Sequence, residues 1–411
     1  MERIVITGMG TINPLGHTVK ETWENAVNGV SGVGPVTLFD TTDWNVKIAS
    51  EVKNFNPDLY MDFKEARRRD RFEQLAVASM KEALESSGIE INDQTTHRTG
   101  VFVSSAIGGL RSMQDNIYTL KDQGFRKVSP FSIAMMMPNG AAGIISIDYG
   151  IRGPSFSISS ACASGSDGIG VAWMLLRSGM IDVAIAGGAE ATVTPVGIGA
   201  FDRATAITRN PDWTSNPKPF DKNRDGLVMG EGSGLLVLET ESHARARGAN
   251  ILAELAGWSS NSDGYHVTSP REDGSGGGLA ILNALEVAGI NKDEVGYINA
   301  HGTATVMNDA AETTSIKFAF GEDAYSIPVS STKSMTGHMM GATGALEAIF
   351  LVQAVREGIL PPTIHYETPD PACDLDYIPN KAREKKVDVA VSNAFGFGGH
   401  NAVLVVRNYE G

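Results

Sequence analysis

ISSAC at residues 158–162 has a counterpart in VSSTK at residues 329–333. Each stretch is followed by an apolar helical pattern punctuated by glycine, and each helical pattern leads to a similar strand-like run, at 182–188 and at 388–392. Three matches in the same order favour a duplicated α/β unit over chance similarity. Duplication would place Cys162 and Lys333 at equivalent turns between strand and helix, so we expect a site at the junction of two halves.

Alternating strand and helix patterns extend over the rest of the chain. Short apolar runs at 4–10, 99–104, 183–186 and 387–391 predict strands, and helical patterns lie between them. The i, i+3, i+4 spacing of apolar residues from 72 to 84, closed by Gly88, predicts an amphipathic helix. This alternation is typical of α/β layers with buried, mostly parallel strands.

A charge-rich segment, ETESHARARG at 239–248, separates two stretches that each restart with apolar runs. We therefore expect an N-terminal half at 1–248 that carries the cysteine turn. The C-terminal half is expected at 249–411.

Composition narrows the possible function classes. The 411 residues carry a net charge of −14, which disfavours a nucleic-acid partner because phosphate backbones are repelled. The most apolar helical stretch, 345–355, is much shorter than a membrane span, and the N-terminus lacks the features of a signal peptide. Two cysteines are too few for a disulfide framework, and this count is typical of proteins in a reducing compartment. We expect a cytoplasmic protein without membrane insertion.

The two cysteines have different surroundings. Cys162 lies at the start of a helix whose first turn consists of small residues, and the positive end of a helix dipole is expected to lower a thiol pKa. This position predicts a reactive nucleophile, with a buried structural cysteine as an equally weighted alternative. Cys373 lies in a loop rich in proline and aspartate, and we expect it to be structural.

Two of the eight histidines stand beside glycine and hydroxyl residues after strand-like runs. They are His301, in NAHGTAT, and His338, in KSMTGH. Two imidazoles at such positions can act as a base or can donate hydrogen bonds together to an oxyanion. Taken singly, each is more often a structural histidine.

Common cofactor motifs are absent from the sequence. There is no HxxH, HExxH or CxxC spacing, so we expect no metal site. Neither GxGxxG after the first strand nor GxxxxGK[ST] occurs, so the glycine-rich strings predict turns rather than a nucleotide site. The run KEARRRDR at 64–71 holds five cations in an acidic chain, and it suggests either a solvated helix start or a docking site for an acidic partner.

Four separated motifs together resemble one family. SACASG, NAHGTAT, SSTKSMTGH and SNAFGFGGHN are similar to the motifs of β-ketoacyl-acyl-carrier-protein synthases, the elongating condensing enzymes of fatty-acid synthesis in the thiolase-like superfamily. The resemblance spans nearly the whole chain and fits best the type II enzymes of dissociated bacterial systems. It implies duplicated thiolase-like halves in an α-β-α-β-α sandwich, a homodimer, acyl- and malonyl-loaded carrier proteins as partners, and no cofactor.

The resemblance also implies catalytic roles. Cys162 would accept the acyl chain, and His301 and His338 would promote malonyl decarboxylation. Lys333 would organise the histidines, with Glu347 as its buried partner.

Other residues would shape the substrate path. Phe397 would be the gating aromatic, and its backbone N–H and that of Cys162 would form the oxyanion hole. Thr303 and Thr305 would bind the pantetheine arm, while the acyl pocket would include Ile107 and Phe201.

Carrier docking is implied at Lys64, Arg67 and Arg68, in agreement with the charge argument. One departure from the family is HGTATV in place of HGTSTP. The loss of the proline removes a fixed φ from that loop, although the supporting residue Asp309 remains.

Three alternatives remain. A polyketide-type ketosynthase would use the same chemistry with a different acyl group. A non-catalytic chain-length subunit typically lacks the nucleophilic cysteine, which is present here. A cysteine hydrolase would not need a lysine and two histidines around one cysteine.

Overall fold

The computed structural model describes residues 2–410. Its strands are β1 (Ile4–Ile12), β2 (Gly34–Pro35), β3 (Ile48–Ala49), β4 (Thr99–Ser104), β5 (Val183–Ala191), β6 (Glu231–Thr240), β7 (Ala253–Ser262), β8 (Val295–Asn299), β9 (Val329–Ser330), β10 (Ile359–Leu360), β11 (Arg383–Glu384), β12 (Val389–Gly396) and β13 (His400–Arg407). Its α-helices are α1 (Val19–Val27), α2 (Phe63–Ala66), α3 (Arg71–Ser87), α4 (Leu110–Gln123), α5 (Ser132–Met136), α6 (Gly140–Tyr149), α7 (Ser164–Arg177), α8 (Pro195–Arg203), α9 (Glu241–Ala246), α10 (Ser275–Ala288), α11 (Val306–Phe320), α12 (Lys333–Thr336) and α13 (Thr343–Glu357). Short 3₁₀ turns connect several of them, including η4 (Ala161–Ala163) before α7.

The strand order shows the duplication. The main sheet runs β4-β5-β6-β1-β7-β13-β12-β8-β9, so the order on one side of the β1–β7 pair repeats on the other. β5 lies between β6 and β4 as β12 lies between β13 and β8, with the same parallel and antiparallel senses. The expected equivalence of the runs at 182–188 and 388–392 is therefore confirmed. Among residues 2–410, the two halves of the sheet join through two residue pairs, Val5 with Glu254 and Ile6 with Ala253.

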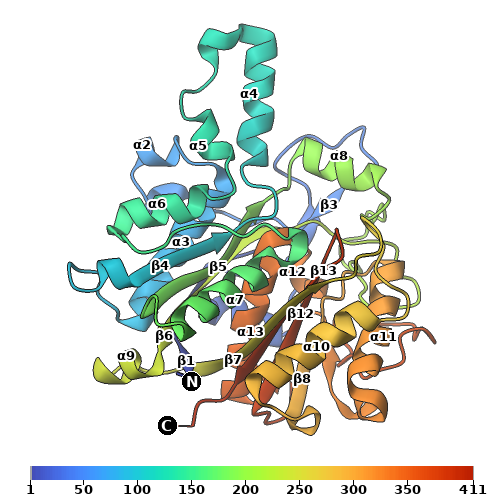
Figure 1. Cartoon of the computed structure of the whole chain (residues 1–411). Coiled ribbons are helices and arrows are strands. Elements are labelled where there is room, and N and C mark those ends of the chain that lie inside the picture. The colour runs from blue at the N-terminus through green and yellow to red at the C-terminus, as the bar shows by residue number, and fades with distance from the viewer. Residues whose placement is uncertain (1, 411) are drawn as a thin grey trace.

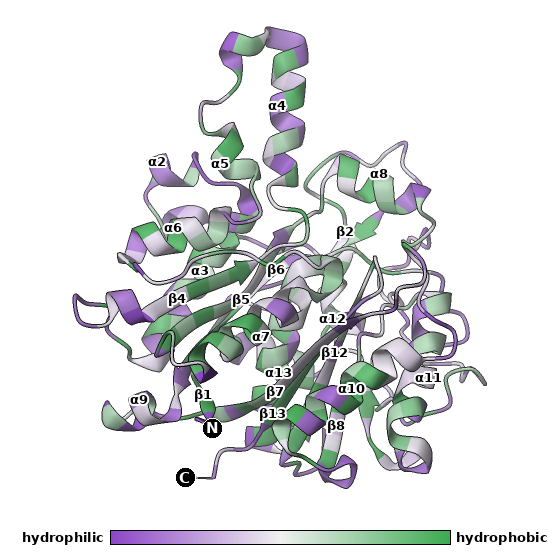
Figure 2. Ribbon diagram, viewed as in Figure 1, coloured by the Kyte–Doolittle hydropathy of each residue, from purple (hydrophilic) through white to green (hydrophobic). Residues whose placement is uncertain are grey.

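Helices cover and separate these two halves of the sheet. α7 and α13 contact each other and strands of both halves, and Figure 1 shows them in the middle of the molecule. α3 packs outside β1, β5 and β6, while α10 packs outside β7 and β13 and against α11. This arrangement confirms the expected layered α/β class, and Figure 2 shows that the neighbouring strands β4 and β5 are strongly hydrophobic. The expectation of mostly parallel strands is wrong, because five of the eight neighbouring strand pairs that the structure describes in the main sheet are antiparallel.

Local sequence signals explain several element boundaries. Asp70 and Glu73 form a reciprocal capping box at the start of α3, and Gly88 ends that helix in the left-handed conformation. The expected helix at 72–84 is thus confirmed, with α3 slightly longer at both ends. The strand expected at 387–391 begins at Val389 and continues to Gly396. The division expected after residue 248 falls between α9 and β7 and stays a prediction.

A helical hairpin projects from the body of the molecule. Figure 1 shows α4 extending away from the layers and α5 beside it, and Figure 2 shows hydrophilic and hydrophobic segments mixed along α4. Between residues 2 and 410, no helix combines the length and apolarity needed to cross a lipid bilayer.

Candidate active site

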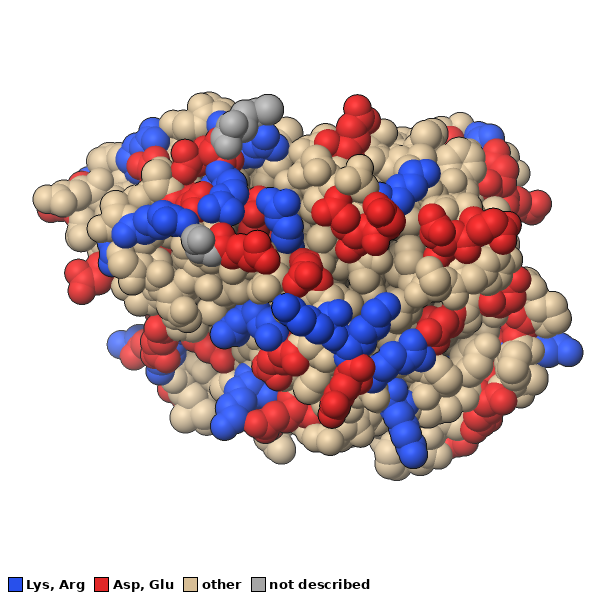
Figure 3. Space-filling view, turned by 90° about the horizontal axis from the view of Figure 1, so that it is seen from below, with Lys and Arg blue, Asp and Glu red and all other residues tan. Residues whose placement is uncertain are grey.

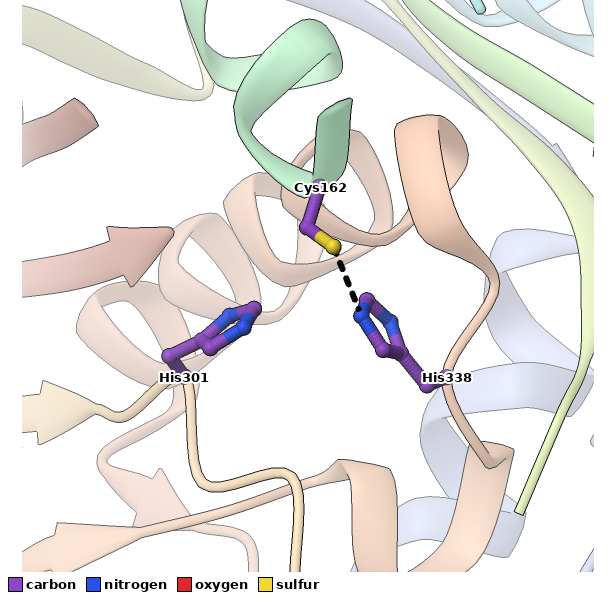
Figure 4. A group of neighbouring side chains, drawn as sticks. All are labelled: Cys162, His301 and His338. Atoms are coloured by element: carbon purple, nitrogen blue, oxygen red, sulfur yellow. Dashed lines mark hydrogen bonds between the residues drawn. The ribbon is translucent and has the colours of Figure 1, made fainter. Parts of the chain in front are cut away.

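Three segments that are far apart in the sequence meet at one point (Figure 4). Cys162 comes from η4, immediately before α7, whereas His301 follows β8 and His338 follows α12. The Cys162 Sγ lies 3.1 Å from the His338 Nε2. The two imidazole rings lie edge to face with 5.4 Å between centroids. The first half of the fold therefore contributes the thiol and the second half contributes both histidines.

The backbone before the thiol adopts an unusual conformation. Ala161 has φ of +52°, a left-handed conformation that costs free energy in a residue with a side chain. Gly396 packs closely against this turn, because a Cβ there would come within 3.1 Å of the Cys162 nitrogen. The surrounding structure thus holds the nucleophile turn in place, and only a residue without a side chain fits opposite it.

Burial keeps the Cys162 thiol protonated in the resting state. Burial raises the thiol pKa to about 11, although Lys333 and the backbone N–H groups of Phe397 and Cys162 lower it in part. The expectation that the helix dipole makes a thiolate is therefore wrong, because desolvation of the charged form outweighs the favourable electrostatics. The thiol needs a base during its reaction, and His338 stands in hydrogen-bonding reach.

Both histidines are buried and neutral. Burial lowers the pKa of His301 and of His338 well below the ordinary value, and the Lys333 ammonium lowers both further. The His338 Nδ1 lies 3.2 Å from the Thr343 hydroxyl, which can accept or donate a hydrogen bond. The His301 Nδ1 is buried without a partner among the described residues.

Lys333 and Glu347 form a buried ion pair beside the histidines. The Lys333 Nζ lies 2.6 Å from the Glu347 Oε1, and both side chains are almost completely buried. Burial raises the pKa of Glu347 to about 7, while Lys333 opposes that rise. The pair holds a positive charge close to both imidazoles, which favours their neutral forms.

Two buried carboxyl groups support the site and were not predicted from the sequence. Glu312 in α11 accepts hydrogen bonds of 2.7 Å from the backbone N–H groups of both His301 and Gly302. Glu190 in β5 accepts one of 2.7 Å from the Ala106 N–H and one of 3.1 Å from the Gly341 N–H. For Glu190, an acidic residue inside the otherwise apolar strand pattern VAIAGGAEA is the signal that could have revealed it. Glu312 lies among other polar residues of α11 and gives no such signal.

A pocket of about 220 Å³ opens beside the three groups and is lined mostly by apolar atoms. Phe201, Thr303, Thr305 and Phe397 line it, as do Cys162 and both histidines. The hydroxyls of Thr303 and Thr305 lie 3.0 Å apart, so together they form a polar part of the pocket wall. Ile107 is not among the lining residues, and its side chain is 40% exposed. Its expected place in the acyl pocket is thus not found within a single chain.

Phe397 lies at the turn between β12 and β13 and covers part of the pocket. Its ring stacks on Phe201 with centroids 6.1 Å apart, and it is 38% exposed. Both following glycines have positive φ, and the Gly398 N–H donates to the Val267 carbonyl at 2.6 Å. A few loop contacts and one ring contact therefore hold this turn.

The loop that lacks the family's proline is fixed by other contacts. Arg224 donates to the carbonyls of Thr305 and Val306 at 3.2 and 3.0 Å. Asp309 is buried and accepts a hydrogen bond of 2.7 Å from the Phe220 N–H, so it anchors the segment that carries Arg224. Thr305 caps α11, which begins at Val306. The fixed φ of a proline is therefore not needed for an ordered loop here.

The basic run at 64–71 divides into two groups. Arg69 and Arg71 are structural, because they pair with Asp148 at 2.7 Å and with Glu231 at 2.6 Å. The other three cations, Lys64, Arg67 and Arg68, are exposed on and just after α2.

Clustered cations are not confined to this region. Figure 3, viewed from below and thus from the side away from α2, shows a band of Lys and Arg side chains bordered by acidic ones. Charge clustering alone therefore does not single out the run as a docking site.

The three reactive groups are also of the types that bind transition metals. One donor atom each from Cys162, His301 and His338 lies within 4.8 Å of the others. No spacing motif could reveal this set, because its members come from separate segments. The nearby Lys333 ammonium opposes binding of a cation here, because it acts electrostatically on all three groups.

Comparison with known proteins gives matches along most of the chain. Residues 1–244 match the family described as Beta-ketoacyl synthase, N-terminal domain, and residues 252–367 match Beta-ketoacyl synthase, C-terminal domain. The 3-oxoacyl-[acyl-carrier-protein] synthase 2 of Staphylococcus aureus is 47% identical over 409 residues, which cover 100% of this chain and 99% of that protein.

Solved structures agree with these matches. A type II polyketide ketosynthase in complex with its acyl-carrier protein, bound to the hexaketide, has a TM-score of 0.92 and 33% identity, with full coverage of both chains. The ishigamide ketosynthase/chain length factor has a TM-score of 0.94 and 33% identity, again with full coverage.

Proposed function

This chain belongs to the β-ketoacyl synthase family, and from that premise we propose that it acts as a 3-oxoacyl-acyl-carrier-protein synthase, an acyltransferase that lengthens acyl chains. The observation that carries this proposal is the arrangement of Cys162, His338 and His301 in one pocket beside the Lys333–Glu347 pair. These groups supply a nucleophile, a base and neutral hydrogen-bond donors.

In the first half-reaction, Cys162 takes the acyl chain from its carrier. The Sγ attacks the thioester carbonyl while its proton passes to the His338 Nε2, 3.1 Å away. The carbonyl oxygen becomes an oxyanion that the N–H groups of Cys162 and Phe397 can bind, since both already face the sulfur. The bond to the pantetheine sulfur breaks, and His338 returns the proton to that sulfur. The carrier leaves as a free thiol, and the acyl group remains on Cys162.

In the second half-reaction, a malonyl thioester enters the same pocket. Its bond to the carboxylate carbon breaks, carbon dioxide leaves, and the electron pair forms an enolate whose oxygen accepts hydrogen bonds from His301 and His338. The enolate carbon attacks the acyl carbonyl on Cys162, and the carbon–sulfur bond breaks. The product is a β-ketoacyl chain two carbons longer, and the released cysteine thiolate takes up one proton.

Thr343 allows His338 to act in both half-reactions. When the Nδ1 donates to the Thr343 hydroxyl, the Nε2 is a free acceptor for the thiol proton. When the hydroxyl instead donates to the Nδ1, the Nε2 carries the proton and can donate to the enolate. The change from acceptor to donor requires the imidazole proton to move from Nδ1 to Nε2, and the Thr343 hydroxyl can pair with either tautomer because it both donates and accepts.

Fatty-acid elongation is favoured over polyketide synthesis and over a non-catalytic subunit. Identity to the Staphylococcus aureus 3-oxoacyl synthase is 47%, against 33% to the type II polyketide ketosynthase and 33% to the ishigamide ketosynthase/chain length factor, and the nucleophile is present. The test is incubation with malonyl-carrier protein and acyl-carrier proteins of two to sixteen carbons, with products identified by mass. One added two-carbon unit across saturated acyl chains supports the proposal. Repeated additions without processing would indicate the polyketide type.

We also propose that this enzyme works in the cytoplasm. Cys162 and Cys373 are both free thiols, which suits a reducing compartment.

The exposed cations Lys64, Arg67 and Arg68 are proposed to dock the acidic carrier protein. Replacing Arg67 and Arg68 by Glu should raise the KM for acyl-carrier protein, because two attractive charges become repulsive. Acylation by a small thioester without the carrier should keep its rate. The wild-type KM should also rise with salt, which screens exposed charges. Equal losses with both donors would contradict docking and would indicate damage to the fold.

Phe397 is proposed to gate the pocket. Phe397→Ala should allow malonyl-carrier protein to enter before Cys162 is acylated, and so should raise decarboxylation relative to condensation. The two rates are measured as carbon dioxide release and β-ketoacyl product. A melting temperature within a few degrees of the wild-type value would confirm that the fold is intact. An unchanged ratio would contradict gating and leave Phe397 as a packing residue.

A homodimer is proposed through the projecting hairpin and the adjoining helix α6. Several apolar side chains of this part of the chain are exposed, namely Ile107, Met113, Ile117, Phe131, Ile133 and Ile147. A second copy covering this surface would also bury Ile107, which lies outside the pocket of one chain.

Ile133→Glu should therefore shift the mass in light scattering from two chains toward one, because a carboxylate resists burial. Leu279→Glu on the outer face of α10 serves as the matched control. A wild-type protein that scatters as a single chain at micromolar concentration would refute the dimer.

A further inference from the structure

We infer that His400 is a positioning residue that, together with Asp167, links the nucleophile turn to the Phe397 turn. Neither residue lines the pocket, and the reaction described above uses neither. The inference rests on the proposed function, because it concerns how the gate and the nucleophile keep their relative positions.

Asp167 lies directly beneath the nucleophile turn. Its carboxylate is 5% exposed and accepts a hydrogen bond of 2.5 Å from the hydroxyl of Ser160, two residues before Cys162. It also accepts one of 3.2 Å from the Trp258 indole N–H, and a further one from Ser260. Asp167 therefore ties the nucleophile turn, at the start of α7, to strand β7 of the other half.

The sheet register places His400 on the same side. Ser262 pairs with His400, and Ser260 pairs with Ala402. Because side chains two residues apart on a strand point to the same side, all four side chains lie on one face of the sheet. Ala402 packs with Ala163, the residue after Cys162, which shows that this face of the sheet is turned toward the nucleophile. An electrostatic contribution from His400 lowers the pKa of Asp167, whereas burial raises it. His400 thus lies on the sheet face that is turned toward the nucleophile, and it interacts electrostatically with Asp167.

The His400 ring also packs on the gating turn. A Cβ built on Gly398 would lie 2.9 Å from the His400 Nε2 and 3.0 Å from its Cδ2, so the imidazole occupies the space next to that glycine. Gly398 has φ of +88° and directly follows Phe397. The ring therefore fills space into which the Phe397 turn could otherwise move. Ser160 is therefore joined to Asp167 by a hydrogen bond, Asp167 interacts electrostatically with His400, and His400 closely approaches Gly398.

Removal of the ring should loosen the gate without removing a catalytic group. His400→Ala is expected to increase the rate of Cys162 alkylation by iodoacetamide several-fold, measured by intact mass. It should also raise malonyl decarboxylation relative to condensation by a similar factor. Asp167→Asn, which keeps the side-chain shape, should move both measurements in the same direction. His97→Ala, which removes an exposed histidine on the 3₁₀ turn Thr96–Arg98, is the matched control and should change neither.

A double-mutant cycle tests the link itself. If His400 and Asp167 act through one set of coupled interactions, the double variant should match the larger single effect, whereas independent roles would give the product of the two effects. Wild-type rates of alkylation and wild-type product ratios in both single variants would overturn the inference. A wild-type enzyme that forms no acyl-Cys162 or no condensation product would instead refute the proposed function, so the two failures are distinguishable.

Discussion

Cys162→Ala abolishes both acyl-enzyme formation and condensation, which is the largest effect expected from any single substitution in this chain. No other thiol among the described residues lies near the two histidines, since the only other cysteine, Cys373, is buried in a separate cluster. Intact-protein mass after incubation with acyl-carrier protein measures the adduct directly. Cys373→Ala is the matched control and should retain the adduct and near wild-type turnover. A stoichiometric adduct on Cys162→Ala would contradict the assignment.

The pKa of Cys162 adds a pH-dependent readout to this experiment. Because burial raises the thiol pKa to about 11, the thiolate fraction should increase about tenfold for each pH unit between 7 and 10. Alkylation of the resting enzyme by iodoacetamide should rise in the same way. A plateau near neutral pH would show that the thiol is already ionised and would contradict the role of His338 as its base.

His301→Ala and His338→Ala should each lower malonyl decarboxylation about 10²- to 10³-fold, the usual cost of removing one preorganised donor to a developing oxyanion. The two variants should differ in the first half-reaction. His338→Ala should also slow acyl transfer, because its Nε2 is the group hydrogen-bonded to the Cys162 Sγ. His301→Ala should leave acyl transfer nearly unchanged.

The measurements are carbon dioxide release from malonyl-carrier protein and the rate of adduct formation. His365→Ala provides a control histidine outside the pocket lining. Unchanged decarboxylation in both variants would refute the pairing of His301 and His338 at the enolate.

The sequence predicts the duplicated architecture well, because strand and helix patterns depend on local periodicity. ISSAC and VSSTK both precede a buried helix, and the strands that follow occupy equivalent places in the sheet. The meeting of Cys162 with His301 and His338 could also be anticipated, since motifs at strand ends of two related halves converge at their junction.

Properties that depend on the environment could not be predicted in this way. The ionisation of Cys162 is set by desolvation, which no sequence pattern measures, and the helix-dipole argument alone gives the wrong direction. Glu312 and Glu190 stabilise backbone N–H groups that come from distant segments, so their partners become visible only in three dimensions. The division of the run at 64–71 likewise depends on Asp148 and Glu231, which no local pattern connects to Arg69 and Arg71.

The two central helices have a consequence for how this chain unfolds. Every residue of α13 from Thr343 to Val355 is buried, and α7 and α13 each contact strands of both halves. Neither half can therefore cover its own central helix. Without those helices, the short β1–β7 pairing contributes little to the stability of the fold. Heat or denaturant should accordingly melt both halves in one cooperative transition, with a single midpoint by circular dichroism and by tryptophan fluorescence. A chain cut near residue 248 should give two fragments that stay insoluble or unfolded until they are refolded together.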